Sequence, residues 1–420
     1  MSVCREKVLF LSGKTRGATL EGIGRSFYNN LRKFDIELVE LNLLDLPGLL
    51  ASLKTFDLSE IRFVLSGAGA GMDLSVVLQE KAVLLWDELR IPFITLHGDS
   101  PAYFFDRHVV PSSNFVSLYA FAEHHELRRR LPKRCGPTGV LPPILLNEIS
   151  SSDLDVHAKT DGTLLFLKNG KDPSQVKRLW STCLNATVCT YLMEMAAELE
   201  DDLDSGRGDQ IDDMVTQYLE NLGVDSEHLV KVRLFCIAQL DDYLRAVKAT
   251  RMAEILAEFP VHIRGNDWHH VNFTGKRATY IDRCDYAESI GLIRSSLGLI
   301  DMSANTASCP HDRVMRAFGA RALCLTNAGQ QFFRGLPYEE ELTFRYEGDS
   351  LRERVAHLLA NKKQAVEYGI AVAEAFRKAN PPERAFEKML HYAALVRLER
   401  LPQRPQGLQD FHVWPPKELS

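Results

Sequence analysis

The residues best suited to chemistry lie in the C-terminal half of the chain, where a loop of small residues joins a strand-like segment to a helix-like one. The segment IDMSANTASCPHDRVMRAFGARALCLTN predicts a strand, a loop that includes Ser303, a helix beginning near residues 311–313, and a second strand. A helix N-terminus and the Arg313 guanidinium would favour a diphosphate there, and His311 and Asp312 could contact phosphate or ribose hydroxyls. The alternative is that Asp312 caps the helix and pairs with Arg313 at the surface.

Three further loops follow strand-like segments of the same half. We expect them at the same edge of a parallel sheet, where glycine permits close backbone approach, Lys171 could neutralise phosphate charge and Tyr280 could hold a nucleobase. Each is also compatible with an ordinary strand-to-helix loop. The candidate residues are Asn169, Gly170 and Lys171 in LKNGKD, Gly265, Asn266 and Trp268 in IRGNDWHH, and Tyr280 and Ile281 in YIDRCDY.

In the N-terminal half, HGDSP follows a strand-like run and places His97 and Asp99 where α/β proteins bind ligands. Asp99 could act as a general base that accepts the proton of an acceptor hydroxyl, with His97 beside it. The alternative for Asp99 is a turn or helix cap before proline, a common use of Asp-Ser-Pro.

Alternating strand-like and helix-like segments must position these residues. They predict an α/β fold with two Rossmann-like domains, residues 1–150 and 160–395, followed by a tail over 396–420. A helical insertion is expected over about 174–258, where apolar stripes recur at helical spacing. In the first domain we also expect a helix around VVLQEKAVLLWDEL.

Composition narrows the kind of partner. A formal net charge of −6 argues against a nucleic-acid binder, and no apolar run approaches the length of a membrane span. The eight cysteines form no CxxC pair and no Cys/His cluster at zinc spacing, which indicates thiols of a reducing compartment and a cytoplasmic protein without a metal site. We also expect no bound cofactor. Two nucleotide-binding patterns fail: GKT lacks the earlier glycine of a P-loop, and Met72 stands where GAGAG would need its last glycine.

Several motifs, in order, resemble one family. TLLFLKNGKDP, HIRGNDW, YIDRCDYAES, the segment from LIDMSAN to LCLTN, and FRYEGDSLRERVAHLLAN are similar to the C-terminal half of GT-B glycosyltransferases, particularly the CgeB-like group. PFITLHGDSP and GVLPPILLN are similar to the N-terminal domain of that group. The resemblance implies metal-independent transfer of a hexosyl or related sugar from a nucleotide-diphosphate donor, bound by the C-terminal domain, to a glycan, protein or small-molecule acceptor in the interdomain cleft. It also implies a place in glycoconjugate or cell-surface polysaccharide synthesis.

Two departures from the family keep other functions open. Arg316 stands where many relatives carry a ribose-binding glutamate, and the helical insertion, which could bind a partner protein, lies outside the family pattern. The alternatives are a nucleotide-sugar epimerase or phosphorylase on the same fold and a non-catalytic binding or assembly module.

Overall fold

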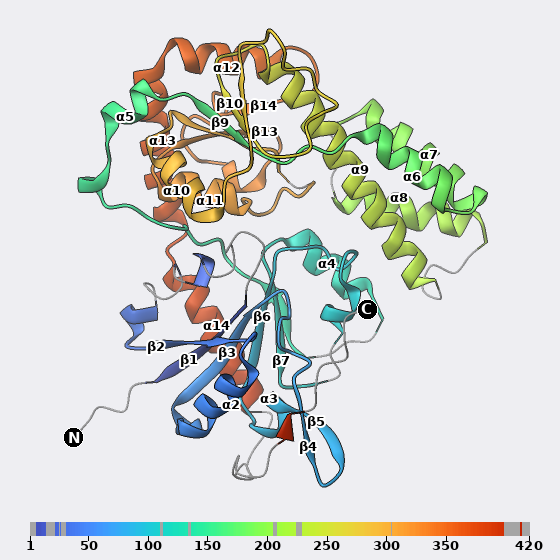
Figure 1. Cartoon of the computed structure of the whole chain (residues 1–420), viewed down its shortest axis with the longest axis vertical. Helices are drawn as coiled ribbons and strands as arrows, with labels where there is room; N and C mark the ends of the chain where they lie inside the picture. The colour runs from blue at the N-terminus through green and yellow to red at the C-terminus, as the bar shows by residue number, and fades with distance from the viewer. Residues whose placement is uncertain are drawn as a thin grey trace. The chain divides into compact units, whose positions relative to one another are not determined.

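Two structural units make up the chain. The computed structural model describes residues 6–13, 22–24, 26, 31–109, 112–132, 136–204, 208–223, 229–303, 305–398 and 412–413 (Figure 1). Unit 1 comprises Met1–Pro142 with Pro382–Ser420, and unit 2 comprises Pro143–Pro381. The last long helix, α14 (Glu383–Leu398), therefore groups with unit 1, whereas the sequence analysis placed most of it in the second domain. Most of the expected tail, 396–420, lies outside the described residues.

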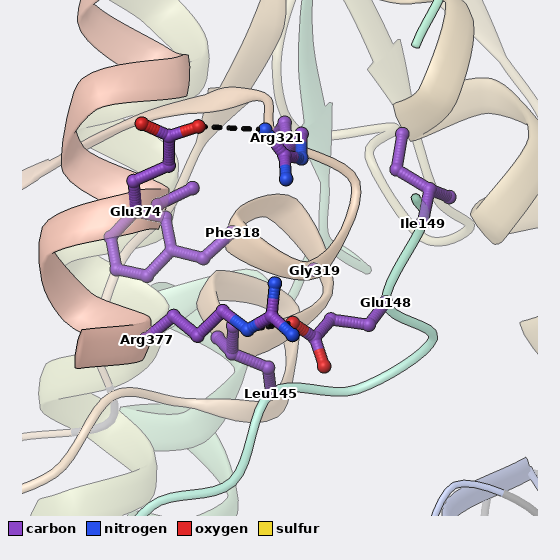
Figure 2. Close-up of a pocket in the computed structure, with 9 residues that line it drawn as sticks. Leu145, Glu148, Ile149, Phe318, Gly319, Arg321, Glu374 and Arg377 are labelled. Carbon is purple, nitrogen blue, oxygen red and sulfur yellow. Dashed lines mark hydrogen bonds and ion pairs between the residues drawn. The ribbon is translucent and has the colours of Figure 1, made fainter. Parts of the chain in front are cut away.

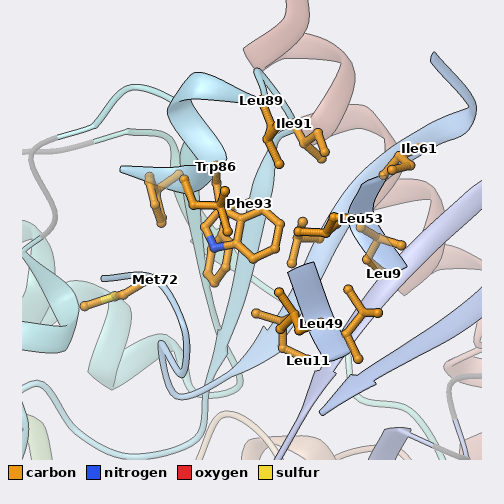
Figure 3. Close-up of a cluster of buried hydrophobic side chains, with 14 of the residues drawn as sticks. Leu9, Leu11, Leu49, Leu53, Ile61, Met72, Trp86, Leu89, Ile91 and Phe93 are labelled. Atoms are coloured by element: carbon orange, nitrogen blue, oxygen red, sulfur yellow. The ribbon is translucent and has the colours of Figure 1, made fainter. Parts of the chain in front are cut away.

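Unit 1 is built on a six-stranded parallel sheet with the order β2-β1-β3-β6-β7-β8. Four of its strands, β1, β3, β6 and β7, are apolar runs that are mostly buried on both faces, as expected of a parallel sheet covered by helices, whereas the edge strand β2 is mostly exposed or half-buried. The core cluster in Figure 3 joins strand residues such as Leu9 and Phe93 to Leu53 and Trp86 from the covering helices. The strands are β1 (Lys7–Ser12), β2 (Glu37–Asn42), β3 (Ile61–Gly67), β6 (Phe93–His97), β7 (Phe115–Tyr119) and β8 (Thr138–Val140). The helices include α2 (Leu46–Thr55), α3 (Leu85–Glu88), α4 (Ala122–Arg130) and α14 (Glu383–Leu398), with α14 packed against β3, β6 and β7.

The prediction of one helix in unit 1 is wrong. The segment VVLQEKAVLLWDEL forms a hairpin of β4 (Ser75–Leu78) and β5 (Lys81–Leu84), and only α3 at its end is helical. Gln79 and Glu80 turn the chain with φ values of 47° and 66°. Two successive left-handed residues match the right-handed twist of the flanking strands, and the β-branched pair Val76 and Val77 suits a strand.

Unit 2 also contains a six-stranded parallel sheet, in the order β11-β10-β9-β12-β13-β14. Counted along the chain this is the order 3-2-1-4-5-6 of a Rossmann sheet, and it confirms the predicted fold class. The strands are β9 (Leu164–Leu167), β10 (His262–Arg264), β11 (Thr279–Ile281), β12 (Gly298–Ile300), β13 (Leu323–Asn327) and β14 (Thr343–Phe344). The surrounding helices include α5 (Val156–Asp161), α10 (Tyr286–Ser295), α11 (Asp312–Gly319), α12 (Ser350–Ala360) and α13 (Lys362–Ala379).

The predicted helical insertion consists of α6 (Pro173–Cys183), α7 (Ala186–Asp201), α8 (Gly208–Asn221) and α9 (Val230–Leu256) (Figure 1). The long helix α9 differs from the others, because it leads directly into β10 and also packs against α12. A buried ion pair between Arg233 and Asp212, with atoms 2.6 Å apart, ties α9 to α8. Helix α9 is therefore part of the Rossmann unit, while it also carries the additional helices.

The segment that enters unit 2 is fixed to the C-terminal end of α11 (Figure 2). The Ile149 amide donates to the Gly319 carbonyl at 3.0 Å, and a Cβ at Gly319 would lie 2.0 Å from the Leu146 carbonyl oxygen, so only glycine fits. Ion pairs between Arg377 and Glu148 and between Arg321 and Glu374 border a small hollow beside this contact. These contacts fix the helix whose other end carries the predicted diphosphate site.

Candidate anion-binding site at the second sheet

The strand order of unit 2 reverses between β9 and β12, and ligands of open α/β sheets bind at such a reversal, beyond the carboxyl ends of the strands. The first residues past these two strands are Lys168 and Asp301. Helix α11 begins near the same edge after the small-residue loop. The candidate site is therefore centred on residues that follow β9 and β12.

Arg313 is held at this edge by a buried carboxylate. Its Nε donates to Asp301 Oδ1 at 2.8 Å, and its Nη2 lies 3.4 Å from the Met302 carbonyl oxygen. Burial alone would lower the pKa of Arg313, but the carboxylates of Asp301 and Asp312 raise it. Nη1 makes no hydrogen bond with any residue that the structure describes. That nitrogen can therefore donate to a ligand without breaking the Asp301 pair.

His311 and Asp312 form a second ion-paired group at the start of α11. His311 is the N-cap residue, and its Nδ1 lies 2.5 Å from Asp312 Oδ1, while Arg316 Nη2 lies 2.9 Å from Asp312 Oδ2. Burial would raise the pKa of Asp312, but the charges of His311 and Arg316 hold it below the ordinary range. The expected alternative, in which Asp312 caps the helix and pairs with Arg313, is therefore not what the structure contains. Arg316 itself is also bonded to Ser289 and stands over the Tyr286 ring.

Lys168 is the cation of this edge that sequence reasoning missed. Its side chain is half-buried, and its ammonium makes no hydrogen bond with a described residue. Burial, followed by the nearby charges of Arg313 and Arg245, lowers the pKa of Lys168 to about 8. A desolvated cation beside other cations is disfavoured unless an anion neutralises it. Lys168 is therefore well suited to a negatively charged ligand.

The other predicted residues of the β9 and β10 loops hold these two loops together. The Gly170 amide donates to the Asn266 carbonyl at 2.8 Å, and the Asn266 amide donates to Asn169 Oδ1 at 3.1 Å. Trp268 is buried, and its indole N–H donates to the Lys168 carbonyl at 2.8 Å. A Cβ at Gly265 would lie 1.9 Å from that same carbonyl oxygen. These residues therefore hold the backbone of Lys168 in place through contacts with its carbonyl group.

Lys171, Tyr280 and Ile281 lie on the outer parts of this edge. Lys171 is exposed and pairs with Asp242 on α9. Tyr280 belongs to the edge strand β11, is 39% exposed, and stacks on Phe273 with ring centres 5.1 Å apart. Ile281 is half-buried, and its carbonyl accepts from the Gly265 amide at 3.1 Å. Their roles in ligand binding stay predictions.

Helix α9 adds three charged residues that sequence reasoning left out of the site. Asp241, Arg245 and Lys248 recur at helical spacing and so share one face, which is the signal that could have indicated them. Arg245 pairs with Asp241 at 2.8 Å, and Lys248 donates to Asn305 Oδ1 in the β12–α11 loop at 3.1 Å. Burial lowers the pKa of Lys248 to about 8.

The polar groups around this edge carry an excess of positive charge. Four cations stand against two carboxylates in the set Lys168, Arg245, Lys248, Arg313, Asp241 and Asp301. The remaining predicted loop residue, Ser303, donates to Asn327 Oδ1 at 2.9 Å and accepts from Gln330 Nε2 at 2.9 Å. Within this set of six side chains, cations outnumber carboxylates, which favours an anionic ligand.

His97 and Asp99 lie in unit 1 and differ sharply in exposure. His97 is 2% exposed and stacks on His108 and Tyr119, with ring centres 4.1 and 5.0 Å away. Burial and then the charges of His108 and Arg128 lower the pKa of His97 well below its ordinary value, which favours the neutral ring. Asp99 is exposed, and the turn after it is capped by Ser100, whose Oγ accepts from the Ala102 amide at 3.3 Å. The Asp99 carboxylate makes no hydrogen bond within the described parts of the chain.

No group of three or more His, Cys, Asp or Glu side chains among the described residues could hold a metal ion. None of the helices in the described ranges is long and apolar enough to cross a membrane.

Known proteins resemble this chain in fold and in part of its sequence. A search of curated proteins finds no match. Among solved structures, sucrose-phosphate synthase from Thermosynechococcus elongatus matches with a TM-score of 0.49 and 10% identity, over 94% of this chain and 100% of that one. The T4 phage BGT in complex with UDP-glucose matches with a TM-score of 0.49 and 7% identity, over 91% and 99% of the two chains. AviGT4, a glycosyltransferase of avilamycin A biosynthesis, matches with a TM-score of 0.46 and 11% identity, over 93% and 98%.

A family model supplies the sequence comparison. Residues 243–391 match the family described as glycosyl transferase-like. The match begins inside α9 and ends inside α14, so it includes the strands β10 to β14, helix α11 and two of the α9 residues of the site, Arg245 and Lys248. The expectation that all of 174–258 lies outside the family pattern is therefore wrong for the second half of α9. The part of the chain that contains Arg313 is similar to glycosyl transferases.

Proposed function

We propose that this chain is a glycosyltransferase of the GT-B kind that uses a nucleotide-diphosphate sugar as its donor. The donor diphosphate is bound at the carboxyl edge of β9 and β12 by Lys168, Arg313 and the N-terminus of α11. The observation that carries the proposal is the unpaired Lys168 ammonium beside the Arg313–Asp301 pair, at the strand reversal of a Rossmann sheet. The glycosyl transferase-like match over residues 243–391 supports the same reaction class.

Lys168 replaces Lys171 as the proposed phosphate ligand. Lys171 is exposed and already neutralised by Asp242, whereas Lys168 is half-buried and makes no direct ion pair with a residue that the structure describes, although the carboxylates of Asp301 and Asp241 act on it from farther away. A desolvated cation interacts more strongly with a diphosphate than an exposed, paired one, because water screens it less. Tyr280, at the exposed edge strand, stays the proposed contact for the nucleobase.

The proposed reaction is a displacement at the anomeric carbon of the donor sugar. The acceptor hydroxyl gives its proton to the Asp99 carboxylate while its oxygen bonds to the anomeric carbon, and the bond from that carbon to the diphosphate oxygen breaks. The nucleoside diphosphate leaves with the bonding electron pair. Lys168 and Arg313 stabilise the negative charge that builds on it, and this work needs no metal ion.

The finer assignments follow the sequence motifs. We place the chain in the CgeB-like group, with hexosyl or related transfer to a glycan, protein or small-molecule acceptor in the cytoplasm. The additional helices α6–α8 are available to a protein partner. An epimerase or phosphorylase and a non-catalytic binding module are the outcomes against which the proposal is tested.

Mass spectrometry of the purified protein with a panel of UDP-, GDP-, ADP- and dTDP-sugars separates these outcomes. Hydrolysis or transfer of the sugar supports the proposal, an isomerised sugar indicates an epimerase, and an unchanged panel would contradict an enzymatic role. Calorimetric titration of the active donor then tests the site. We expect Lys168→Ala and Arg313→Ala to weaken donor binding at least about tenfold, the loss of one charge-assisted contact, and Lys171→Ala to change it little.

A further inference from the structure

Asn305 occupies an unusual place in the loop between β12 and α11. It adopts a left-handed conformation, with φ of 46°, and it is 3% exposed. Asparagine tolerates this conformation better than most residues, but not without cost. A buried left-handed residue persists where surrounding contacts hold it in place.

The side-chain contacts that hold Asn305 come from one face of α9, while its backbone amide donates to the Ser303 carbonyl within the loop at 3.0 Å. Its Nδ2 donates to Asp241 Oδ1 at 2.8 Å and to the Asp241 carbonyl at 3.1 Å, and its Oδ1 accepts from Lys248 Nζ at 3.1 Å. Arg245 bonds to the other oxygen of Asp241, at 2.8 Å, and fixes that carboxylate. Every hydrogen-bonding atom of the Asn305 amide group is thus directed at α9, and two of its partners are charged.

Other contacts fix the loop on either side of Asn305. Ser303 is bonded to Asn327, the last residue of β13, and to Gln330 just after it, and the Ala307 carbonyl accepts from the Gln331 amide at 2.8 Å. The loop ends at the start of α11, where Arg313 reaches back to the Met302 carbonyl. Between the contacts of Ser303 and Ala307, the Asn305 side chain attaches the loop to α9 through three hydrogen bonds.

We propose that Asn305 is a positioning residue that lets α9 hold the β12–α11 loop in the conformation presenting Arg313 and the start of α11 to the donor. This inference rests on the proposed function for its ligand. The attachment of the loop to α9 through Asn305 does not depend on the proposed function, because these hydrogen bonds are present in the ligand-free protein. The proposal gives a positioning role to the α9 face formed by Asp241, Arg245 and Lys248, of which Asp241 and Lys248 are buried.

The test replaces Asn305 by glycine, which keeps the left-handed backbone accessible while removing all three side-chain hydrogen bonds. The matched control is Arg321→Gly, because Arg321 also has a left-handed backbone (φ 50°) in unit 2 and loses its ion pair with Glu374 at the opposite end of α11 (Figure 2). Hydrogen–deuterium exchange of the ligand-free proteins reports on the loop. Titration with inorganic pyrophosphate reports on the site without choosing a nucleotide.

We expect faster exchange over residues 305–310 in Asn305→Gly but not in the control, together with about tenfold weaker pyrophosphate binding, the loss of one well-oriented polar contact. The melting temperature of each variant is measured as well, and both should stay well above the temperature of the exchange and binding experiments, so that global unfolding does not explain the difference. Asn305→Asp should bind as weakly as Asn305→Gly, because it would set a carboxylate against Asp241.

Wild-type exchange over residues 305–310 in Asn305→Gly would overturn the attachment. Faster exchange with unchanged pyrophosphate affinity would overturn the positioning role. A wild-type protein that binds no pyrophosphate and no nucleotide sugar, but whose loop exchange still depends on Asn305, would contradict the proposed function and leave the attachment by α9 supported.

Discussion

The sharpest consequence of the site concerns the pH dependence of donor binding. The pKa of Lys168 is lowered to about 8 in the ligand-free protein, and a bound diphosphate would raise it again. Donor binding should therefore take up a proton above pH 8, and affinity should fall as the pH rises. At a pKa of about 8, the protonated fraction of Lys168 is roughly 90% at pH 7 and roughly 10% at pH 9.

From this fraction we expect the dissociation constant of the donor to rise about tenfold between pH 7 and pH 9, equivalent to about 1.4 kcal/mol. The diphosphate of a nucleotide sugar carries the same charge over this range, so it does not contribute to the pH dependence. Calorimetry in buffers of different ionisation enthalpy, at constant ionic strength, measures both the affinity and the proton uptake. Lys168→Arg should bind with an affinity that is nearly independent of pH, because arginine stays protonated throughout.

Lys248 is the control for this assignment, since its pKa is also lowered to about 8. Lys248→Met should keep the pH dependence, and Lys168→Ala should abolish it. A wild-type affinity that is constant from pH 7 to pH 9, or a Lys168→Ala variant that retains the wild-type slope, would refute the role of Lys168.

Three further predictions concern other parts of the chain. Asp99→Asn should lower turnover about 100-fold or more while the donor affinity is retained, measured by steady-state rates and titration, and normal turnover would remove Asp99 as the base. Gly265→Ala should lower the unfolding free energy by about 2–4 kcal/mol in urea titrations, because its Cβ would lie 1.9 Å from the Lys168 carbonyl oxygen. Lys159 is 1% exposed, and burial lowers its pKa to about 8. Between about pH 8 and pH 10.5 the unfolded chain therefore binds more protons at Lys159 than the folded protein does, so wild-type stability rises with pH over this range. Lys159→Met should therefore stabilise the protein at pH 7 by up to about 3 kcal/mol and make its stability less dependent on pH above 8. An unchanged urea midpoint at pH 7 would count against a destabilising charge on Lys159.

Much of the fold could be predicted because buried parallel strands are continuous apolar runs. KVLFLS and LLFL need no tertiary information to be recognised. The hairpin at residues 75–84 was missed because its apolar residues fit a helix as well as two short strands, and Gln79–Glu80 is not a typical turn pair. Short apolar runs of this kind are ambiguous in sequence.

The site was only partly predictable for a different reason. Arg313 could be identified from its place at the start of a helix that follows a strand and a loop of small residues. The choice between Lys168 and Lys171 depends on which ammonium has a counter-ion, and the partner of Lys171 is 71 residues away in the sequence. Asn305 and Asp241 are 64 residues apart, so no local pattern connects them. Along α9, the apolar stripe was used to predict a helix, and the charged residues Asp241, Arg245 and Lys248 were not assigned to the site.

The return of the chain to its first unit determines how the protein can be divided for study. Phe386 and Met389 of α14 are fully buried, and their helix covers β3, β6 and β7. A fragment that stops at residue 142 would leave that face of the sheet exposed to water, and we expect such a fragment to aggregate. Unit 2 is one uninterrupted stretch, residues 143–381, so we expect it to fold when it is expressed alone. To obtain unit 1 in isolation, residues 382–398 would have to be joined behind residue 142 by a flexible linker, so that the missing helix is supplied by the same polypeptide.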